Sequence, residues 1–390
     1  MTINLYSSIA LEPWDWTTPW TTGIGGSETS HIEITERLGR KYGGLVRSYA
    51  PIRDSVSCKS CGPALVPWFN INQARPEDEQ GIWLVYRDQT FFNRDLRPDS
   101  RYWFIAQDCD YAWTPEQLAK VHRYICLCQD HVDFTNAKYP ELNGRVFLST
   151  NGVRSSYIER NFEPSGLDSW CALDNASRGE RKDELIRKPW RLFYASSPDR
   201  GLLLILRHWF RIRERVLNAE LRVAYGFNNI EAMLNMGYAE TDRMAQTYEI
   251  KSLLNQPGVT WLGRLNQHDV YREFFRAGLW YYPTDWPETS CISCMEAQAC
   301  GAIPVTNAYW ALKQNILNGV LIDGIPQEDP VCRTMMIREL CSLMLNPARQ
   351  QEIREPMMRD ALDSFDWQKI VNKQLVPWIK EDLEVMNARL

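Results

Sequence analysis

Short apolar runs alternate with amphipathic segments along most of the chain. In the first half, the apolar runs have the length of buried strands: Ile3–Tyr6, Leu45–Tyr49, Ile82–Tyr86, Tyr102–Ala106, Tyr124–Cys128 and Arg145–Ser149. Apolar residues at helical spacing mark three segments between them: Glu28–Tyr42, Pro115–Val121 and Val132–Lys138. Strands that alternate with helices in this way are typical of a doubly wound parallel sheet, so the first half is predicted to be an α/β domain.

The same alternation begins again after residues 158–188, a polar and charged stretch with few apolar residues. We interpret this stretch as a linker between two domains, with a long surface excursion of the first domain as the alternative. Further strands are predicted at Arg191–Ala195, Leu221–Tyr225, Val259–Leu262, Leu279–Tyr282, Ala302–Val305 and Val320–Ile322. Further helices are predicted at Gly201–Leu217, Val270–Ala277, Ser290–Ala299, Cys332–Leu345 and Trp367–Met386.

Length and charge narrow the class of protein. A chain of 390 residues is too long for one ordinary domain, so two domains are expected. The net charge of −5 and the pI near 5.7 argue against nucleic-acid binding, which usually requires a basic face. We expect a cytoplasmic protein, because the sequence shows no signal-peptide pattern and no apolar run approaches the about 20 residues that span a bilayer. Peripheral contact with a membrane stays open.

The 11 cysteines are expected to be reduced thiols, because the chain is large and lacks a secretory signal. Two pairs have the CxxC spacing: Cys58 with Cys61, and Cys291 with Cys294. The first pair has the spacing of half a zinc site, but neither a matching second pair nor clustered histidines accompany it. Thiols without a metal are therefore the preferred interpretation, and zinc at the first pair is the alternative.

The candidate functional residues are most concentrated in the segment Pro283–Val305. Glu288 and Glu296 are separated by seven residues at a predicted strand-to-helix junction. Since a helix rises about 1.5 Å per residue, Glu296 should lie roughly two turns beyond the helix start, with Glu288 in the loop before it. The backbone N–H groups at the start of a helix favour an anion between the two carboxylates. Two carboxylates for hydroxyls and a row of amides for phosphate suit a nucleotide sugar.

With the residues around it, this segment resembles the signature of the family-4 retaining glycosyltransferases, which have the GT-B fold. The run ETSCISCMEAQACGAIPV, from Glu288 to Val305, contains both acids and the glycine and Pro-Val that close the signature. Thr-Ser-Cys stands where the family has Gly-Phe-Gly. The resemblance implies two Rossmann-like, doubly wound parallel-sheet domains that face a central cleft. Residues 1–170 would form the acceptor-side domain, residues 185–350 the donor domain, and residues 355–390 helices that cross back to the first domain.

The resemblance also suggests site residues in the first half. Gly25 and Gly26 lie in a loop similar to the family's Gly-Gly-x-Glu loop, which faces the donor phosphate and the acceptor. A plain turn with a helix cap is the alternative. Gln107 and Asp108 stand where many relatives place His or His-Asp beside the reacting sugar. Asp108 would contact a hydroxyl of the transferred sugar, with an ordinary loop carboxylate as the alternative.

In the second half, the resemblance gives the donor site its basic residues. Arg200, directly before a glycine, matches the basic residue that neutralises the diphosphate. Arginine suits this role because it is always charged and binds phosphate in a bidentate manner. Ser196 stands near the position where relatives bring a second basic residue, and Arg264 is the candidate for that missing charge. For both arginines, a solvated surface charge is the alternative.

The predicted reaction is transfer of a hexosyl-type group from a UDP- or GDP-sugar to an acceptor hydroxyl, on a glycan or another molecule, with retention of anomeric configuration. Glu296 would hydrogen-bond the ribose hydroxyls, and Glu288 the hydroxyls of the transferred sugar. The diphosphate would lie against the segment Thr289, Ser290, Cys291 and Ile292, with no metal and no other cofactor required. The alternatives are a silent nucleotide-sugar-binding subunit and a sugar-nucleotide epimerase of the same fold.

Overall fold

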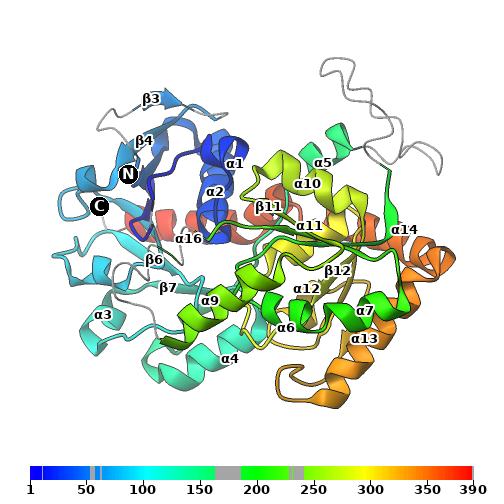
Figure 1. Cartoon of the computed structure of the whole chain (residues 1–390). Coiled ribbons are helices and arrows are strands. Elements are labelled where there is room, and N and C mark those ends of the chain that lie inside the picture. The colour runs from blue at the N-terminus through cyan, green and yellow to red at the C-terminus, as the bar shows by residue number, and fades with distance from the viewer. Residues whose placement is uncertain are drawn as a thin grey trace. The chain divides into compact units, whose positions relative to one another are not determined.

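The computed structural model describes residues 1–10, 12–52, 58–61, 64–162, 186–227, 231 and 241–388, with the backbone alone for residues 58–61 and 241–244. The chain divides into two compact units. The first contains Met1–Gly152, Glu288–Ser290 and Trp367–Leu390, and the second contains Val153–Pro287 and Cys291–Asp366. Each unit is built on one sheet, so the predicted architecture of two doubly wound sheets is confirmed (Figure 1).

The sheet of the first unit has eight strands in the order β3-β4-β2-β1-β5-β6-β7-β8. Neighbouring strands are parallel, except that β3 pairs antiparallel with β4. The strands are β1 (Thr2–Ser7), β2 (Val46–Ala50), β3 (Cys58–Cys61), β4 (Val66–Asn70), β5 (Gly81–Tyr86), β6 (Arg101–Ile105), β7 (Arg123–Cys126) and β8 (Val146–Leu148). The order runs outward from β1 in one direction and from β5 in the other, so the sheet has its switch point between these two strands.

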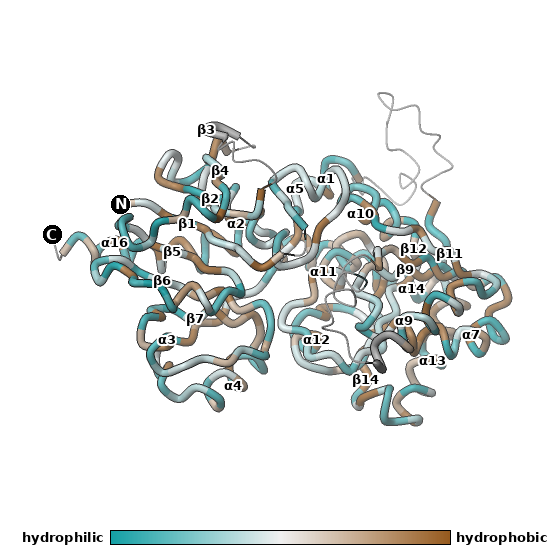
Figure 2. The backbone as a smooth tube through the Cα atoms, turned by 60° about the vertical axis from the view of Figure 1, so that its left-hand side comes forward, coloured by the Kyte–Doolittle hydropathy of each residue, from teal (hydrophilic) through white to brown (hydrophobic). Residues whose placement is uncertain are grey.

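Strand β5 shows why the apolar runs form strands in this unit. All of its residues are buried, because helices cover both faces of the sheet. Ile82 and Leu84 belong to the core on one face, and Trp83 and Val85 to the core on the other. Figure 2 shows the corresponding hydrophobic colouring along the central strands.

Helices from the first 138 residues and from the carboxyl-terminal segment cover the first sheet. They are α1 (Thr18–Thr21), α2 (Gly26–Tyr42), α3 (Pro115–Lys120), α4 (Gln129–Lys138), α15 (Trp367–Ile370) and α16 (Val376–Asn387), with a π-helical turn at Val371–Leu375. The short 3₁₀ helices are η1 (Gly43–Leu45), η2 (Ile71–Gln73), η3 (Gln89–Asn93) and η4 (Pro140–Leu142). Helix α2 and the carboxyl-terminal helices pack on one face, and η3 and α3 pack on the other.

The sheet of the second unit has six parallel strands in the order β11-β10-β9-β12-β13-β14. They are β9 (Lys188–Tyr194), β10 (Glu220–Ala224), β11 (Val259–Gly263), β12 (Ala277–Tyr282), β13 (Ile303–Asn307) and β14 (Val320–Ile322). The switch point of this sheet lies between β9 and β12. The helices are α5 (Ser155–Asn161), α6 (Leu202–Arg207), α7 (Trp209–Arg215), α9 (Thr241–Leu253), α10 (Gln267–Arg276), α11 (Ile292–Ala299), α12 (Leu312–Asn315), α13 (Pro330–Met344) and α14 (Pro347–Ser364).

The structure corrects several details of the predicted elements. The prediction of a single helix over Gly201–Leu217 is wrong. His208 leaves helical geometry, with φ −111° and ψ 5°, and separates α6 from α7. Strands β3 and β4 and helices α1, α5, α9 and α12 were not predicted, and α14 begins before residue 355, where the carboxyl-terminal helices were expected to start. Of the proposed linker, residues 163–185 lie outside the described part of the chain. Within the part that is described, none of the helices combines the length and apolarity needed to cross a membrane.

Candidate functional site

The switch point of the second sheet brings Arg200 and the segment after β12 together. Gly201 has φ +106°, and a Cβ atom at this position would overlap the carbonyl oxygen of Pro283. Only glycine therefore allows the loop after β9 to pack directly against the loop after β12. The motif residue next to Arg200 is explained by this close approach.

Arg200 is held by an aromatic ring and leaves one donor unused. Its guanidinium carbon lies 3.4 Å from the centroid of the Trp286 ring, a cation–π contact. Its Nε atom lies 3.5 Å from Asp199 Oδ1. Its Nη1 atom is buried and has no hydrogen-bond partner among the described residues. A fixed guanidinium with an unused N–H group suits an anion.

The helix of the signature begins later than predicted. Helix α11 starts at Ile292 rather than Ser290, with the buried Cys291 as its N-cap residue. The backbone N–H of Cys291 donates to Asn315 Oδ1 at 3.0 Å, so this amide is already engaged within the unit. Of the four residues expected to lie against a diphosphate, Thr289 to Ile292, only Ile292 lies in the first turn of the helix.

Glu296 and Arg264 lie on separate elements of the second unit. Glu296 is buried in α11, and its Oε1 atom accepts a hydrogen bond of 2.5 Å from Gln267 Nε2 in α10. Arg264 is half-buried and follows Gly263, which ends β11 with φ +68°. Ser196 is also half-buried, and its Oγ atom lies 3.2 Å from the hydroxyl of Tyr282.

The three residues Glu288–Ser290 belong to the first unit, although their neighbours on both sides belong to the second. Thr289 Oγ1 donates to the carbonyl oxygen of Gln107 at 2.8 Å. The backbone N–H of Asn151 donates to Ser290 Oγ at 3.1 Å. These bonds attach the segment to the carboxyl ends of β6 and β8. The carboxylates of Glu288 and Glu296 are therefore positioned by different units.

Asp108 lies beyond the carboxyl end of β6 and forms an ion pair that the sequence did not predict. Arg87 Nε donates to Asp108 Oδ2 at 2.8 Å, and Arg87 Nη1 lies 3.7 Å from Glu28 Oε1. Gly25 is the N-cap residue of α2, and a Cβ atom there would clash with the Glu28 carboxylate. The Glu28 carboxylate thus lies against Gly25, and Gly26 begins the helix beside it.

Cysteine chemistry is disfavoured in this region. Burial raises the pKa of the Cys109 thiol to about 12, with smaller contributions from Cys128, Asp108, Cys126 and Glu288. Burial likewise raises the pKa of Cys126 to about 12. Both thiols are protonated near neutral pH, so neither supplies a thiolate nucleophile.

Among the described side chains, no group of three or more His, Cys, Asp or Glu residues is arranged to hold a metal ion. Cys294 is buried, and its Sγ atom lies 3.7 Å from the carbonyl oxygen of Asn315. The side chains of Cys58 and Cys61 lie outside the described residues, so zinc at this pair stays a hypothesis.

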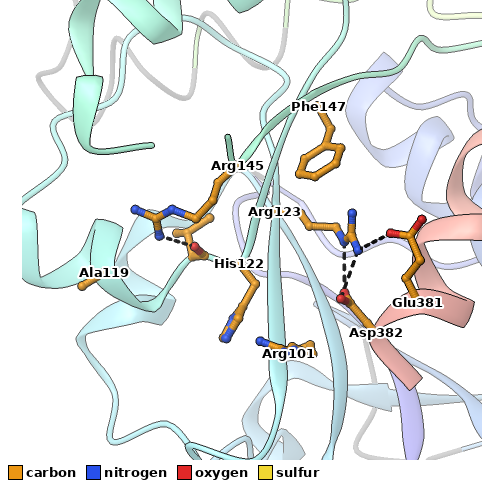
Figure 3. A pocket seen from close by; sticks show the side chains of 9 residues that line it. Arg101, Ala119, His122, Arg123, Arg145, Phe147, Glu381 and Asp382 are labelled. Atoms are coloured by element: carbon orange, nitrogen blue, oxygen red, sulfur yellow. Dashed lines mark hydrogen bonds and ion pairs between the residues drawn. The ribbon is translucent and has the colours of Figure 1, made fainter. Parts of the chain in front are cut away.

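A separate cavity of about 730 Å³ lies at the opposite, amino-terminal edge of the first sheet (Figure 3). Its charged groups are engaged with protein atoms. Arg123 binds Asp382 at 3.1 Å and Glu381 at 2.9 Å. Arg145 donates to the carbonyl oxygens of Leu118 and Val121. These bonds hold α16 and the turn before β7, so we assign this cavity no part in the candidate site.

Comparisons with known proteins support the fold rather than a particular relative. No protein-family model matches the sequence, and no curated protein matches it either. Among solved structures, the sucrose-phosphate synthase of Thermosynechococcus elongatus is similar with a TM-score of 0.66 at 10% identity, over 97% of this chain and 99% of that one. The catalytic domain of Arabidopsis thaliana starch synthase IV, bound to ADP and acarbose, gives a TM-score of 0.64 at 12% identity, over 98% and 99% of the two chains. Anabaena HepE in complex with UDP and glucose gives 0.63 at 13% identity, over 98% and 100%. The chain has the GT-B fold of these glycosyltransferases.

Proposed function

We propose that the chain transfers a hexosyl-type group from a nucleoside diphosphate sugar, a UDP- or GDP-sugar, to an acceptor hydroxyl with retention of configuration. The fold supports this proposal over almost the whole length of the chain. Two of the similar structures have a nucleoside diphosphate bound, ADP in one and UDP in the other. The geometry of the second unit supports it independently.

The observation that carries the proposal is the position of Arg200. Open α/β sheets bind ligands beyond the carboxyl ends of their strands, at the point where the strand order reverses. In the second unit, Arg200 follows β9 and the signature follows β12, the two strands that flank this point. The unused Nη1 donor of Arg200, fixed by stacking on Trp286, suits the diphosphate of the donor.

The two carboxylates would then recognise hydroxyls. Glu296 is buried in α11 and would hydrogen-bond the ribose, with Gln267 fixing its orientation. Glu288 would hydrogen-bond the transferred sugar. A buried carboxylate that keeps a ligand hydroxyl as partner avoids part of the cost of burial, which favours the assignment of Glu296.

The reaction itself would depend on stabilising the leaving group. The bond from the anomeric carbon to the phosphate oxygen breaks, and the bond from that carbon to the acceptor oxygen forms on the same face. The acceptor proton passes to the departing phosphate oxygen, so the diphosphate leaves with its charge partly neutralised. Arg200 and the amino end of α11 supply fixed positive potential where this charge develops, without a divalent metal.

The first test is thermal unfolding of the full chain against UDP-, GDP-, ADP- and dTDP-sugars, with and without EDTA. A ligand that binds only the folded state stabilises it by about 2.7 kcal/mol at a hundred times its dissociation constant. We expect one nucleotide to raise the Tm in an EDTA-insensitive manner. Absence of a shift with all four nucleotides would contradict a donor site.

Variants of the two carboxylates make the assignment specific. Glu296→Ala should abolish most of the Tm shift, whereas Glu288→Ala should keep the shift and lose turnover. Glu352→Ala, an exposed glutamate of α14, is the matched control and should keep both. Donor binding without turnover in the unmodified chain would instead support a silent binding subunit. The residue that favours this alternative is Gln107, which stands where relatives place histidine.

A further inference from the structure

Arg87 has a backbone conformation that arginine rarely adopts. It follows β5 with φ +62°, in the left-handed region, and costs about 1–2 kcal/mol relative to an ordinary conformation. Its N–H donates to the carbonyl oxygen of Ile105 at 3.3 Å, and the next N–H, of Asp88, donates to that of Tyr86 at 2.7 Å. Such strain persists where the surroundings fix it, and it often accompanies a functional role.

The turn is fixed by Asp88 rather than by the Arg87 side chain. Asp88 is buried, and its Oδ1 atom accepts from the N–H of Thr90 at 2.9 Å and from the Thr90 hydroxyl at 2.5 Å. Its Oδ2 atom accepts from the Ser8 hydroxyl at 2.5 Å. Removal of the Arg87 side chain should therefore leave the backbone of the turn in place.

The Arg87 guanidinium joins two elements at the switch point of the first sheet. Arg87 follows β5, and Glu28 lies in the first turn of α2, after the glycine loop that follows β1. Asp108 follows β6 and holds the guanidinium at 2.8 Å. Burial alone lowers the pKa of Arg87, but Asp108 and Glu28 outweigh this effect and raise it above its usual value. The group is permanently charged.

This pair retains hydrogen-bonding capacity. Asp108 Oδ1 and Arg87 Nη2 have no hydrogen-bond partner among the described residues. The two side chains are 39% and 27% exposed, so a ligand can reach them. One acceptor and one donor on a rigid pair match a sugar hydroxyl or two adjacent hydroxyls, each of which donates and accepts.

We propose that Arg87 is a positioning residue that holds the Asp108 carboxylate toward a hydroxyl of the transferred sugar. The left-handed turn places the guanidinium between Asp108 and Glu28, and the ion pair with Nε fixes the rotation of the Asp108 carboxylate. This inference rests on the proposed function. Its content is that the Arg87 guanidinium, at the switch point of the first sheet, orients the Asp108 carboxylate through its geometry and not through its charge alone.

The test compares steady-state kinetics of Arg87→Gly, Arg87→Lys and Asp108→Asn with those of the unmodified enzyme, at varied donor concentration. Glycine adopts the left-handed conformation without strain, so Arg87→Gly removes the side chain and keeps the turn. Arg87→Asn is the second variant, because asparagine also tolerates this conformation. Leu65→Gly relieves a left-handed residue with φ +54° that is exposed, and it controls for the release of strain.

We expect Arg87→Gly and Arg87→Asn to lower kcat about 10- to 100-fold, the range for groups that orient a functional ligand, with the donor KM little changed. Arg87→Lys should recover only part of the activity, because a lysine ammonium cannot reproduce the guanidinium geometry. Millimolar guanidinium should raise the activity of Arg87→Gly, but not that of the unmodified enzyme or of Asp108→Asn. The double variant Arg87→Gly/Asp108→Asn should be no slower than Asp108→Asn, since both changes disrupt one unit.

Three results would overturn the inference. Unchanged kcat in Arg87→Gly and Arg87→Asn would show that Asp108 needs no support. Loss of activity that guanidinium does not restore, with multiplicative effects in the double variant, would indicate a general structural role. If the unmodified enzyme turns over no nucleotide sugar, the proposed function and this inference are refuted together. If it does turn over and only the Arg87 variants behave differently from expectation, the inference alone is refuted.

Discussion

Mild acid should destabilise the first unit through His31. This residue of α2 is fully buried, and its ring lies among Trp14, Trp68 and Tyr86, with centroid distances of 5.2, 5.8 and 4.9 Å. Its Nε2 atom lies 2.8 Å from Ser48 Oγ. Its Nδ1 atom has no hydrogen-bond partner among the described residues. Burial of the ring therefore opposes the charged imidazolium form of His31.

The magnitude follows from the pKa of His31, which burial lowers from 6.5 to about 3. The unfolded chain takes up a proton below pH 6.5, while the folded chain does so only near pH 3, so stability is complete above pH 6.5 and falls as the pH decreases toward 3. At about pH 5 the loss is about 2 kcal/mol, from about 1.5 pH units at roughly 1.4 kcal/mol each.

The assay is urea unfolding at about pH 7.5 and at about pH 5. Hydrogen exchange in peptides from α2 monitors the unfolding, so that the measured free energy refers to the first unit. His31→Gln removes the titrating group and keeps a polar group near Ser48. Between the two pH values, this variant should therefore lose about 2 kcal/mol less unfolding free energy than the unmodified chain. Ser48→Ala is the matched control: it removes the hydrogen bond but leaves the histidine, and should retain the pH dependence. An equal pH dependence in His31→Gln and the unmodified chain would refute the reasoning.

Two further predictions concern stability. Asp382→Ala should lower the free energy of unfolding by about 3 kcal/mol or more, because it leaves the buried Arg123 without its main partner. Replacing both residues by leucine should lower it by less, and urea unfolding of the two variants and the unmodified chain measures the difference. Gly201→Ala should lower the free energy of unfolding by about 3 kcal/mol, through strain at positive φ and overlap with a carbonyl oxygen. Gly144→Ala, at an exposed position with φ +74° and open space around the added Cβ, should lower it by about 1 kcal/mol in the same assay.

The strands were predictable because both sheets are covered on both faces. A strand buried on both sides appears in the sequence as a continuous apolar run, as Gly81–Tyr86 does. The helix over Gly201–Leu217 was not predicted correctly, because apolar residues continue at helical spacing across His208, where the chain bends to pack two short helices. Periodicity reports which residues are buried and does not report where a helix turns.

The candidate site was predictable only where it is local in sequence. The order of Arg200 and Gly201, or of Glu288 and Glu296, is visible in the chain itself. Arg87 was missed, because nothing in its neighbourhood marks an arginine with positive φ. The attachment of Thr289 to Gln107 joins residues 182 positions apart, and such a bond has no local signal.

That attachment bears on the difference between this chain and the family signature. Glu288–Ser290 belongs to the first unit, so the chain passes between the units on both sides of these three residues. Thr289 and Ser290 supply the hydroxyls that bind Gln107 and Asn151, and the glycine and phenylalanine of the family signature would supply neither at these two positions. Since the bonds fix the residues directly after Glu288, they restrict the backbone from which its carboxylate projects. The replacement of Gly-Phe-Gly by Thr-Ser-Cys is therefore better understood as a different way of holding Glu288 than as loss of the site, which favours the enzyme over the silent binding subunit.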